Sequence, residues 1–374
     1  GGSAWDSMAF DPELNTLYVG TGNGSPWNRN IRSPGGGDNL YLSSILALDP
    51  DTGRLKWHYQ TTPKDTWDYT ATQHIILADF EIDGQPRKVL MQAPKNGFFY
   101  VLDRETGGLL SAKNYVSVTW ASHVDLVSGR PVETGGDYAD APKIVFPSPV
   151  GGHNWHPMAY NPNTNYVYIP ALENPWLYIN QKDYEPLDHW WNTGTDAAEM
   201  VRMAKLAPAP LPVGYLKAWD PVKQQEAWRV QLPSAANGGV LATAGNLVFQ
   251  GTGDGRLIAY NAETGAQVWE MTTNVGTVAP PISYSVDGEQ YIAVVSGWGG
   301  VPAILGTDAG VAASETYVNS GHVFAFKLGG AASLPEIEVK RFTTVPPPPT
   351  INATPAEIAE GERLYHQHCN VCHG

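Results

Sequence analysis

Cysteine is almost absent from this chain of 374 residues, which contains only Cys369 and Cys372. Basic residues are also scarce, with 23 Lys and Arg against 37 Asp and Glu, and the resulting net charge of −14 argues against nucleic acid or anionic membranes as partners. No apolar run is long enough to span a membrane. The chain also begins without an initiator Met or a leader, so we expect a fragment or a processed piece.

Turn-forming and aromatic residues are abundant instead. The sequence has 39 Gly, 30 Pro, 13 Trp and 18 Tyr, a composition typical of an all-β protein with many turns. With 42% hydrophobic residues, a chain of this length can bury the core of one large domain and add a small one.

The segment ALDPDTGRLKW at residues 47–57 has the pattern of a hairpin, with two apolar strands on either side of turn residues. The frame recurs along the chain, complete at 261–269 and partial from Asp220 and Asp103, where the Thr-Gly or the Trp is missing. Such a period predicts a radial β-repeat in which the flat Trp rings lie between neighbouring sheets. We expect about five blades' worth of antiparallel strands within residues 1–328, with three indoles buried between sheets: Trp57, Trp228 and Trp269.

A second repeated element is an apolar strand that runs into small residues, seen at 17–23, 166–171, 247–254 and 291–297. Small residues let backbones approach closely, as they must near a central axis. Two polar and aromatic insertions, at about 117–148 and 175–212, interrupt the repeat, and we expect them to form loops at the rim.

The composition of the sequence changes after Lys327, where the repeated strand patterns end. Residues 329–353 form a predicted proline-rich linker that contains four consecutive prolines at 346–349. Thr354, Pro355 and Glu357 then supply a helix N-cap, a proline in the first turn and a capping-box carboxylate. Residues 354–374 therefore predict the helical start of a second domain.

The sequence CNVCH at 369–373 matches the c-type haem attachment motif, in which Cys369 and Cys372 bind the haem covalently and His373 ligates iron. The alternatives are a chance pair of cysteines or a zinc site. Zinc would need further nitrogen or sulfur ligands, for which His366 and His368 are the nearby candidates. We favour haem c, which also predicts a location outside the cytoplasm.

Several motifs in order resemble the quinohaemoprotein alcohol dehydrogenases, which use pyrroloquinoline quinone (PQQ) and calcium in an eight-bladed propeller. The motifs are GGSAWD at 1–6, GTGNGSPWN at 20–28, TPKDTWDYT at 62–70, PKNGFFYVLDR at 94–104 and GGHNWHPMAYNP at 151–162. The resemblance implies the later part of such a propeller, a linker and a truncated cytochrome c domain. It also implies periplasmic oxidation of a small primary alcohol to an aldehyde. Electrons would pass to haem c and on to a downstream acceptor, such as a cytochrome, a copper protein or a membrane quinone.

The same resemblance suggests roles for individual residues. Trp5 matches the aromatic floor on which the quinone stacks, and Asn23 a calcium ligand. Asp68 matches the catalytic base, which also borders calcium. Lys95 matches the cation that contacts the ortho-quinone oxygens, and Asn154 and Trp155 match residues at the quinone's edge.

Taken singly, these residues have ordinary explanations as well. Asn23 suits any glycine-rich turn, and Asp68 could be a turn or capping carboxylate, as we expect Asp65 nearby to be. Lys95 could be a solvated surface lysine. Asn154 and Trp155 could be a pair in the propeller core.

The metal can be argued from the residue two positions after Asp68. Lanthanide-using relatives carry a second Asp there, whereas this chain has Thr70, which adds no negative charge. Ligand charge helps to select between hard cations, so calcium is expected. The alternative is that Thr70 only packs in a strand. The family's calcium-binding Glu and its other quinone contacts belong to an N-terminal half not in this sequence, so we expect the chain alone to be inactive.

Three other functions fit parts of the sequence. The repeats alone would suit a non-catalytic assembly scaffold. A sugar-type quinoprotein dehydrogenase would keep the quinone but usually carries a membrane anchor instead of a haem domain. A binding propeller fused to a cytochrome domain is the third.

Overall fold

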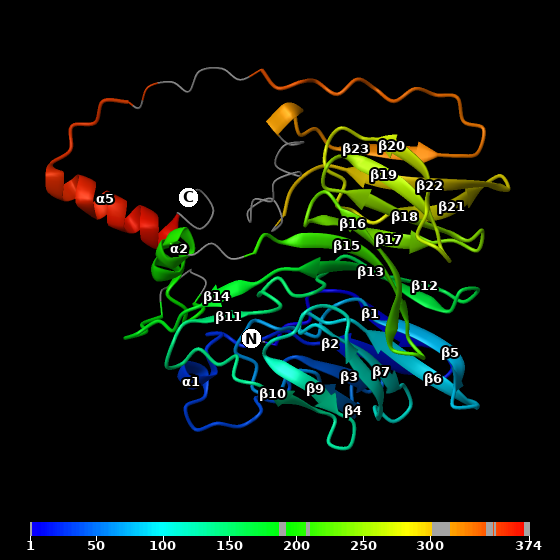
Figure 1. The fold of residues 1–374 in the computed structure, drawn as a ribbon, viewed down its shortest axis with the longest axis horizontal. Coiled ribbons are helices and arrows are strands. Elements are labelled where there is room, and N and C mark those ends of the chain that lie inside the picture. Colours follow the sequence, from blue (N-terminus) through cyan, green and yellow to red (C-terminus); the bar gives the residue numbers. More distant parts are fainter. Residues whose placement is uncertain are drawn as a thin grey trace.

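The computed structural model describes residues 2–186, 192–206, 210–300, 315–341, 347 and 349–369. Antiparallel strands are its main secondary structure, and Figure 1 shows them as successive sheets from the N-terminal strands to β23 at the opposite end. Among the described residues, no helix combines the length and apolar character needed to cross a membrane. The expected mostly-β fold is confirmed.

Five sheets of three or four strands follow one another along the chain. The first contains β1 (Met8–Asp11), β2 (Thr16–Gly20), β3 (Ser44–Leu48) and β4 (Leu55–Gln60), and the second contains β5 (Ile76–Ile82), β6 (Gln85–Gln92), β7 (Phe98–Asp103) and β8 (Leu109–Asn114). The third contains β12 (Ala159–Asn161), β13 (Tyr166–Glu173), β15 (Val213–Asp220) and β16 (Gln225–Leu232). The fourth contains β17 (Asn237–Ala242), β18 (Leu247–Thr252), β19 (Arg256–Asn261) and β20 (Gln267–Thr272), and the fifth contains β21 (Ile282–Val286), β22 (Glu289–Ser296) and β23 (His322–Phe326).

The two insertions carry short elements of their own. In the first, β9 (Ala121–Asp125) pairs with β10 (Arg130–Glu133). The strand β11 (Lys143–Val145) of the first insertion pairs with β14 (Trp176–Tyr178) of the second, and this pairing joins the two insertions. The helices described within residues 2–300 are the short α1 (Arg29–Arg32) and α2 (Ala197–Leu206).

The predicted hairpin at 47–57 is present as β3 and β4. Asp49 closes its turn, because the carboxylate accepts hydrogen bonds from the backbone N–H groups of Asp51 and Thr52, both at 3.0 Å. Gly53 then adopts a φ of +69°, a conformation that favours glycine. The turns at Gly107 and Gly265 repeat this geometry with φ of +75° and +71°, as the sequence frame predicts.

Tryptophans of one sheet cover the turn of the next. A Cβ added at Gly107 would lie 2.6 Å from the Trp57 ring, and one added at Gly265 would lie 2.6 Å from the Trp228 ring. The Trp228 indole N–H also donates to the carbonyl of Ala262 at 3.1 Å. Both tryptophans are half-buried between sheets, so glycine is required in these turns by contact as well as by conformation.

Trp269 departs from the expected burial, because 38% of its side chain is exposed. Its ring meets the edge of Phe326 at 5.5 Å, in the fifth sheet. That sheet joins β22 to β23 through a long connection, and its described part offers no Asp-x-x-Thr-Gly turn to receive the indole. In the first sheet, the turn at Gly53 has no covering tryptophan among the described residues, since nothing lies within 4 Å of a Cβ added there.

Part of the segment that follows the fifth sheet still packs against the preceding part of the chain. Ile337 is buried in a cluster with Val275, Val278 and Trp298, and Val339 pairs with Tyr317. The helix α5 (Pro355–His368) begins with the predicted capping box, in which Thr354 and Glu357 each bond the other's backbone N–H. Figure 1 shows α5 well away from the five sheets.

Candidate active site

Asp68 lies in the loop between β4 and β5, in an unusual backbone conformation. Its φ is +69°, in the left-handed region that few non-glycine residues adopt. The Asp65 carboxylate lies beside it and accepts hydrogen bonds from the N–H of Trp67 at 3.1 Å and of Tyr69 at 3.0 Å. The two residues that flank Asp68 are therefore held by one side chain, which confirms the expectation that Asp65 is a capping carboxylate.

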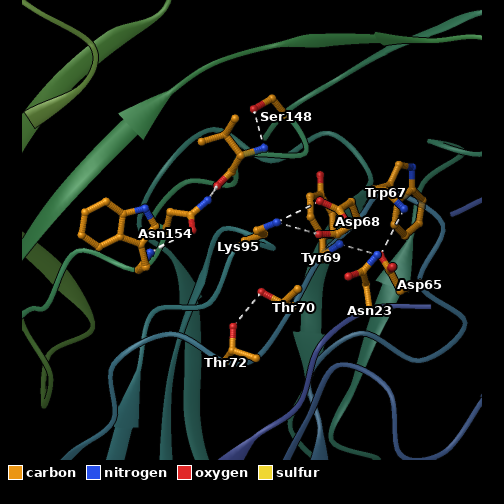
Figure 2. Close-up of polar contacts among 12 residues, drawn as sticks. Asn23, Asp65, Trp67, Asp68, Tyr69, Thr70, Thr72, Lys95, Ser148 and Asn154 are labelled. Carbon is orange, nitrogen blue, oxygen red and sulfur yellow. Dashed lines mark hydrogen bonds and ion pairs between the residues drawn. The ribbon is translucent and has the colours of Figure 1, made fainter. Parts of the chain in front are cut away.

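Lys95 faces Asp68 from the loop between β6 and β7 (Figure 2). Its Nζ donates to the Asp68 carboxylate at 2.9 Å and to the Asp68 carbonyl at 3.2 Å. Gly151 packs directly on this lysine, since an added Cβ would lie 2.6 Å from the Lys95 Cα, Cβ and Cγ atoms. The structure thus brings Asp68 and Lys95 together, and Gly151 restricts the position of the lysine by packing against it.

The Asp68–Lys95 ion pair is largely shielded from water, with 17% of the Asp68 side chain and 8% of the Lys95 side chain exposed. Burial raises the pKa of the Asp68 carboxyl above its ordinary value, and the nearby Lys95 ammonium opposes that shift. A carboxylate that is held in place, partly desolvated and paired with a cation has the properties of a general base.

Asn23 lies beside this pair, in the loop between β2 and β3 (Figure 2). The loop is held there because the Ala71 N–H donates to the Thr21 carbonyl at 3.0 Å, and because Gly20 packs against the backbone of Ala71. The Asn23 amide nitrogen donates to the Gly24 carbonyl at 3.1 Å. Its amide oxygen is thus the end left to act as a ligand.

Trp5 lies next to the same loop. The Gly22 N–H donates to the Ser3 carbonyl at 3.1 Å, and a Cβ added at Gly22 would lie 3.6 Å from the Trp5 indole. The indole is 45% exposed. An exposed, flat aromatic surface beside a metal-ligand candidate is suited to stacking against a planar group.

Asn154 and Trp155 lie in the segment between β11 and β12, and Figure 2 shows Asn154 on the far side of Lys95 from Asp68. The Asn154 amide is used within its own turn: it donates to the Val150 carbonyl at 2.7 Å and accepts from the Trp155 N–H at 2.9 Å. The Trp155 ring stacks on His156 with centroids 3.9 Å apart.

Thr70 is buried and turned into the protein. Its hydroxyl exchanges hydrogen bonds with the Gln73 amide at 2.9 and 3.2 Å and accepts from Thr72 at 3.2 Å. It therefore adds no charged oxygen beside Asp68.

The haem motif is only partly within the described residues. Cys369 follows α5 and is exposed, whereas Cys372 and His373 lie outside the described part of the chain.

The donor atoms gathered here fit the predicted metal and quinone. Asn23 and Asp68 supply an amide oxygen and a carboxylate, which are hard ligands of the kind that calcium prefers. Within the described residues, no group of three or more His, Cys, Asp or Glu side chains could hold a metal. Asn23 and Asp68 would thus form only part of a calcium shell, with Trp5 and Lys95 placed to contact a planar quinone.

Sequence reasoning missed the contribution of Arg32. Its guanidinium donates to the carbonyls of Pro26 and Trp27 at 2.6 and 2.7 Å, and to the carbonyl of Asp65. The arginine comes from α1 and meets both site loops through space, so the motifs carry no signal for it.

A family model described as the glucose/ethanol/alcohol dehydrogenase β-propeller domain matches residues 1–119 and 131–292. Quinohemoprotein alcohol dehydrogenase ADH IIB of Pseudomonas putida is 52% identical over 100% of this chain and 54% of its own length. Quinohemoprotein alcohol dehydrogenase of Comamonas testosteroni is 50% identical over 100% of this chain and 52% of its own length. The chain thus spans about half the length of the curated relatives it matches.

Solved structures agree with these sequence matches. The crystal structure of the Comamonas testosteroni enzyme superposes with a TM-score of 0.86 at 48% identity, covering 100% of this chain and 54% of that one. A europium-containing methanol dehydrogenase gives a TM-score of 0.76 at 29% identity, covering 88% of this chain and 60% of that one. On this combined basis, the chain belongs to the PQQ-dependent quinohaemoprotein alcohol dehydrogenase family.

Proposed function

We propose that the full-length protein oxidises primary alcohols to aldehydes, using PQQ and calcium, and delivers the electrons to a covalently bound haem c. The observation that supports this most is the shielded Asp68–Lys95 pair, held beside Asn23 by loops from two sheets. A non-catalytic scaffold needs no such pair.

Asp68 acts as the general base in this proposal. Its carboxylate takes the hydroxyl proton of the alcohol, and burial favours this role because it raises the carboxyl's pKa toward the working range. The left-handed backbone at Asp68 presents the side chain toward Lys95. When bound, PQQ supplies the two-electron acceptor and calcium the Lewis acid that polarises it.

Lys95 has two tasks. Its ammonium orients the Asp68 carboxylate through the 2.9 Å contact and keeps a positive charge where negative charge develops on the oxidant. An ammonium has three donors, so it can hold Asp68 and still reach a quinone oxygen. Trp5 forms the stacking floor, with Asn154 and Trp155 at the quinone's edge.

The architecture follows the same scheme. The five sheets of residues 1–328 are blades of an eight-bladed propeller, residues 329–353 connect it to the cytochrome domain, and residues 354–374 begin that domain. Cys369, Cys372 and His373 attach and ligate the haem. The protein works in the periplasm and passes electrons to a cytochrome, a copper protein or a membrane quinone.

Calcium is the proposed metal, with Asn23 and Asp68 among its ligands. The buried, internally bonded hydroxyl of Thr70 supports this choice over a trivalent lanthanide, because it supplies no additional negative charge.

The decisive experiment uses full-length protein loaded with PQQ, calcium and haem. Asp68→Asn should lower kcat by at least about 1000-fold, because an amide cannot accept the alcohol proton, while the quinone absorbance shows that the cofactor stays bound. Asp140→Asn, at an exposed position, is the matched control and should behave as wild type. Activity near wild type in the Asp68 variant would overturn the proposed role.

A further inference from the structure

Two loops must be aligned for the proposed site to bind metal. Asn23 lies between β2 and β3, and Asp68 lies between β4 and β5, so neither belongs to a strand that fixes the other. The separation of these two side chains therefore depends on contacts between the loops.

Arg32 makes such contacts on the Asn23 side. Its Nη1 donates to the carbonyls of Pro26 at 2.6 Å and Trp27 at 2.7 Å. Its aliphatic stem also lies against Gly24, since a Cβ added there would be 2.6 Å from the Arg32 Cδ and Nε atoms. The Arg32 side chain thus contacts three of the four residues that follow Asn23 in the chain.

The same guanidinium reaches the Asp68 side. Its Nη2 donates to the carbonyl of Asp65, and its Nε donates to the Asn39 side chain at 3.0 Å. A planar guanidinium with several fixed donors can hold two loops at a defined distance, which a single ammonium on a flexible stem cannot do equally well.

Asp65 continues the connection to Asp68. Its residue is 1% exposed, and its Oδ1 accepts from the N–H groups of Trp67 and Tyr69, on both sides of Asp68. These bonds hold the φ of +69° at Asp68, a conformation that an L-residue keeps only when its surroundings impose it.

We propose that Arg32 and Asp65 form a clasp that sets the separation of Asn23 and Asp68, and thereby the calcium affinity of the site and the position of the base. This inference rests on the proposed function. Both members are positioning residues, because they act through the loop backbones and supply no ligand themselves.

The test measures calcium affinity in full-length protein, followed through the calcium dependence of the bound quinone's absorbance, together with kcat and KM. Outer residues that orient metal ligands typically contribute 10- to 100-fold in affinity. We expect Arg32→Ala and Asp65→Ala to weaken calcium binding by about this factor and to lower kcat more than they raise KM. All measurements are made well below each variant's melting temperature, so that a general loss of stability does not mimic the effect.

Conservative variants sharpen the result. Asp65→Asn keeps an oxygen acceptor for the Trp67 and Tyr69 N–H groups and should retain most of the calcium affinity. Arg32→Lys cannot span both loops and should fall between wild type and Arg32→Ala. Arg130→Ala removes an exposed arginine that pairs with Asp38, and should leave affinity unchanged.

The outcomes separate the two proposals. If Asn23→Ala and Asp68→Asn leave calcium affinity and activity intact, the proposed function fails. If those variants impair both, while Arg32→Ala and Asp65→Ala bind calcium as wild type does, only the clasp is wrong. Should Arg32→Ala not fold, Gly24→Ala, which crowds the arginine stem, must weaken calcium binding for the clasp to stand.

Discussion

His156 is buried and His74 is half-buried, and desolvation favours the neutral form of both rings. Desolvation lowers the pKa of His74 to about 4 and that of His156 to about 3, and the neighbouring His153 adds to both shifts. The His74 Nδ1 and the His156 Nε2 atoms have no hydrogen-bond partner in the described part of the chain. Protonating the His156 ring would place a positive charge in the interior of the protein.

Acid should therefore destabilise the fold through these rings. In the unfolded chain a histidine takes up its proton near pH 6.5, whereas in the folded chain it does so only near pH 3 to 4. The unfolded state thus binds more protons between these values, and the free energy of unfolding falls as the pH drops below about 6.5. For His156 alone the loss is about 2 kcal/mol at pH 5.

Urea unfolding at pH 7.5 and pH 5 measures this effect. His156→Phe, which keeps a ring to stack on Trp155, should lose less stability on acidification than wild type. His123→Gln, at an exposed position in β9, is the control and should follow the wild-type curve. An unchanged pH dependence in His156→Phe would show that this ring is not a source of acid sensitivity.

Single residues were predictable where a local motif carried them. The TPKDTWDYT and GTGNGSPWN segments indicated Asp68 and Asn23, and the structure brings both to one place. The Arg32 contact was not predictable, because a long side chain from α1 reaches carbonyls on two other loops. No spacing in the sequence encodes that kind of through-space contact.

At the scale of the elements, the recurring hairpin turns provide a matched comparison. Gly53 and Gly107 occupy the same turn position with φ of +69° and +75°, so alanine is strained at both. A Cβ at Gly107 would meet the Trp57 ring, whereas a Cβ at Gly53 meets nothing within 4 Å. The tryptophan contact therefore distinguishes the two sites.

Gly53→Ala should cost about 1–2 kcal/mol, the strain of a left-handed residue. Gly107→Ala should cost a further 1–3 kcal/mol or so, because the Trp57 ring must move away from a tightly packed interface. Chemical denaturation of the two variants gives the difference directly. Equal losses would mean that Trp57 does not pack firmly on the neighbouring turn.

Hairpins were the best predicted elements, since Asp, Thr and Gly at fixed spacing define the turn chemistry locally. The burial of Trp269 was predicted wrongly, because a tryptophan is covered only when the next sheet supplies a matching turn. The strands β11 and β14 were also missed. Each is only three residues long, and they pair across a large distance in sequence.

At the scale of the described chain, the first and fifth sheets lie at opposite ends (Figure 1). One face of the fifth sheet is apolar and exposed, because the strand pairing brings the following side chains to the same side: Ile282, Tyr284, Val286, Val295 and Val323. Exposed apolar surface of this kind promotes association.

This chain should therefore self-associate through that face. Val323→Lys should reduce light scattering at high protein concentration, with little change in stability, because 74% of the Val323 side chain is already exposed. Val127→Lys, at an isolated turn position that is 97% exposed, should leave scattering unchanged. Equal scattering by wild type and Val323→Lys would exclude the fifth sheet as the associating surface.

The order of the strands along the chain also affects how the protein folds. Each of the five sheets pairs neighbouring strands in the order of the sequence, apart from the inserted β14. Local pairing of this kind lowers the entropic cost of loop closure and speeds folding. When the chain emerges N-terminus first into the compartment where it folds, each sheet can form from its own segment. Trp57 and Trp228 then stay uncovered until the following turn emerges, so the first and third sheets each offer a surface on which the next sheet docks.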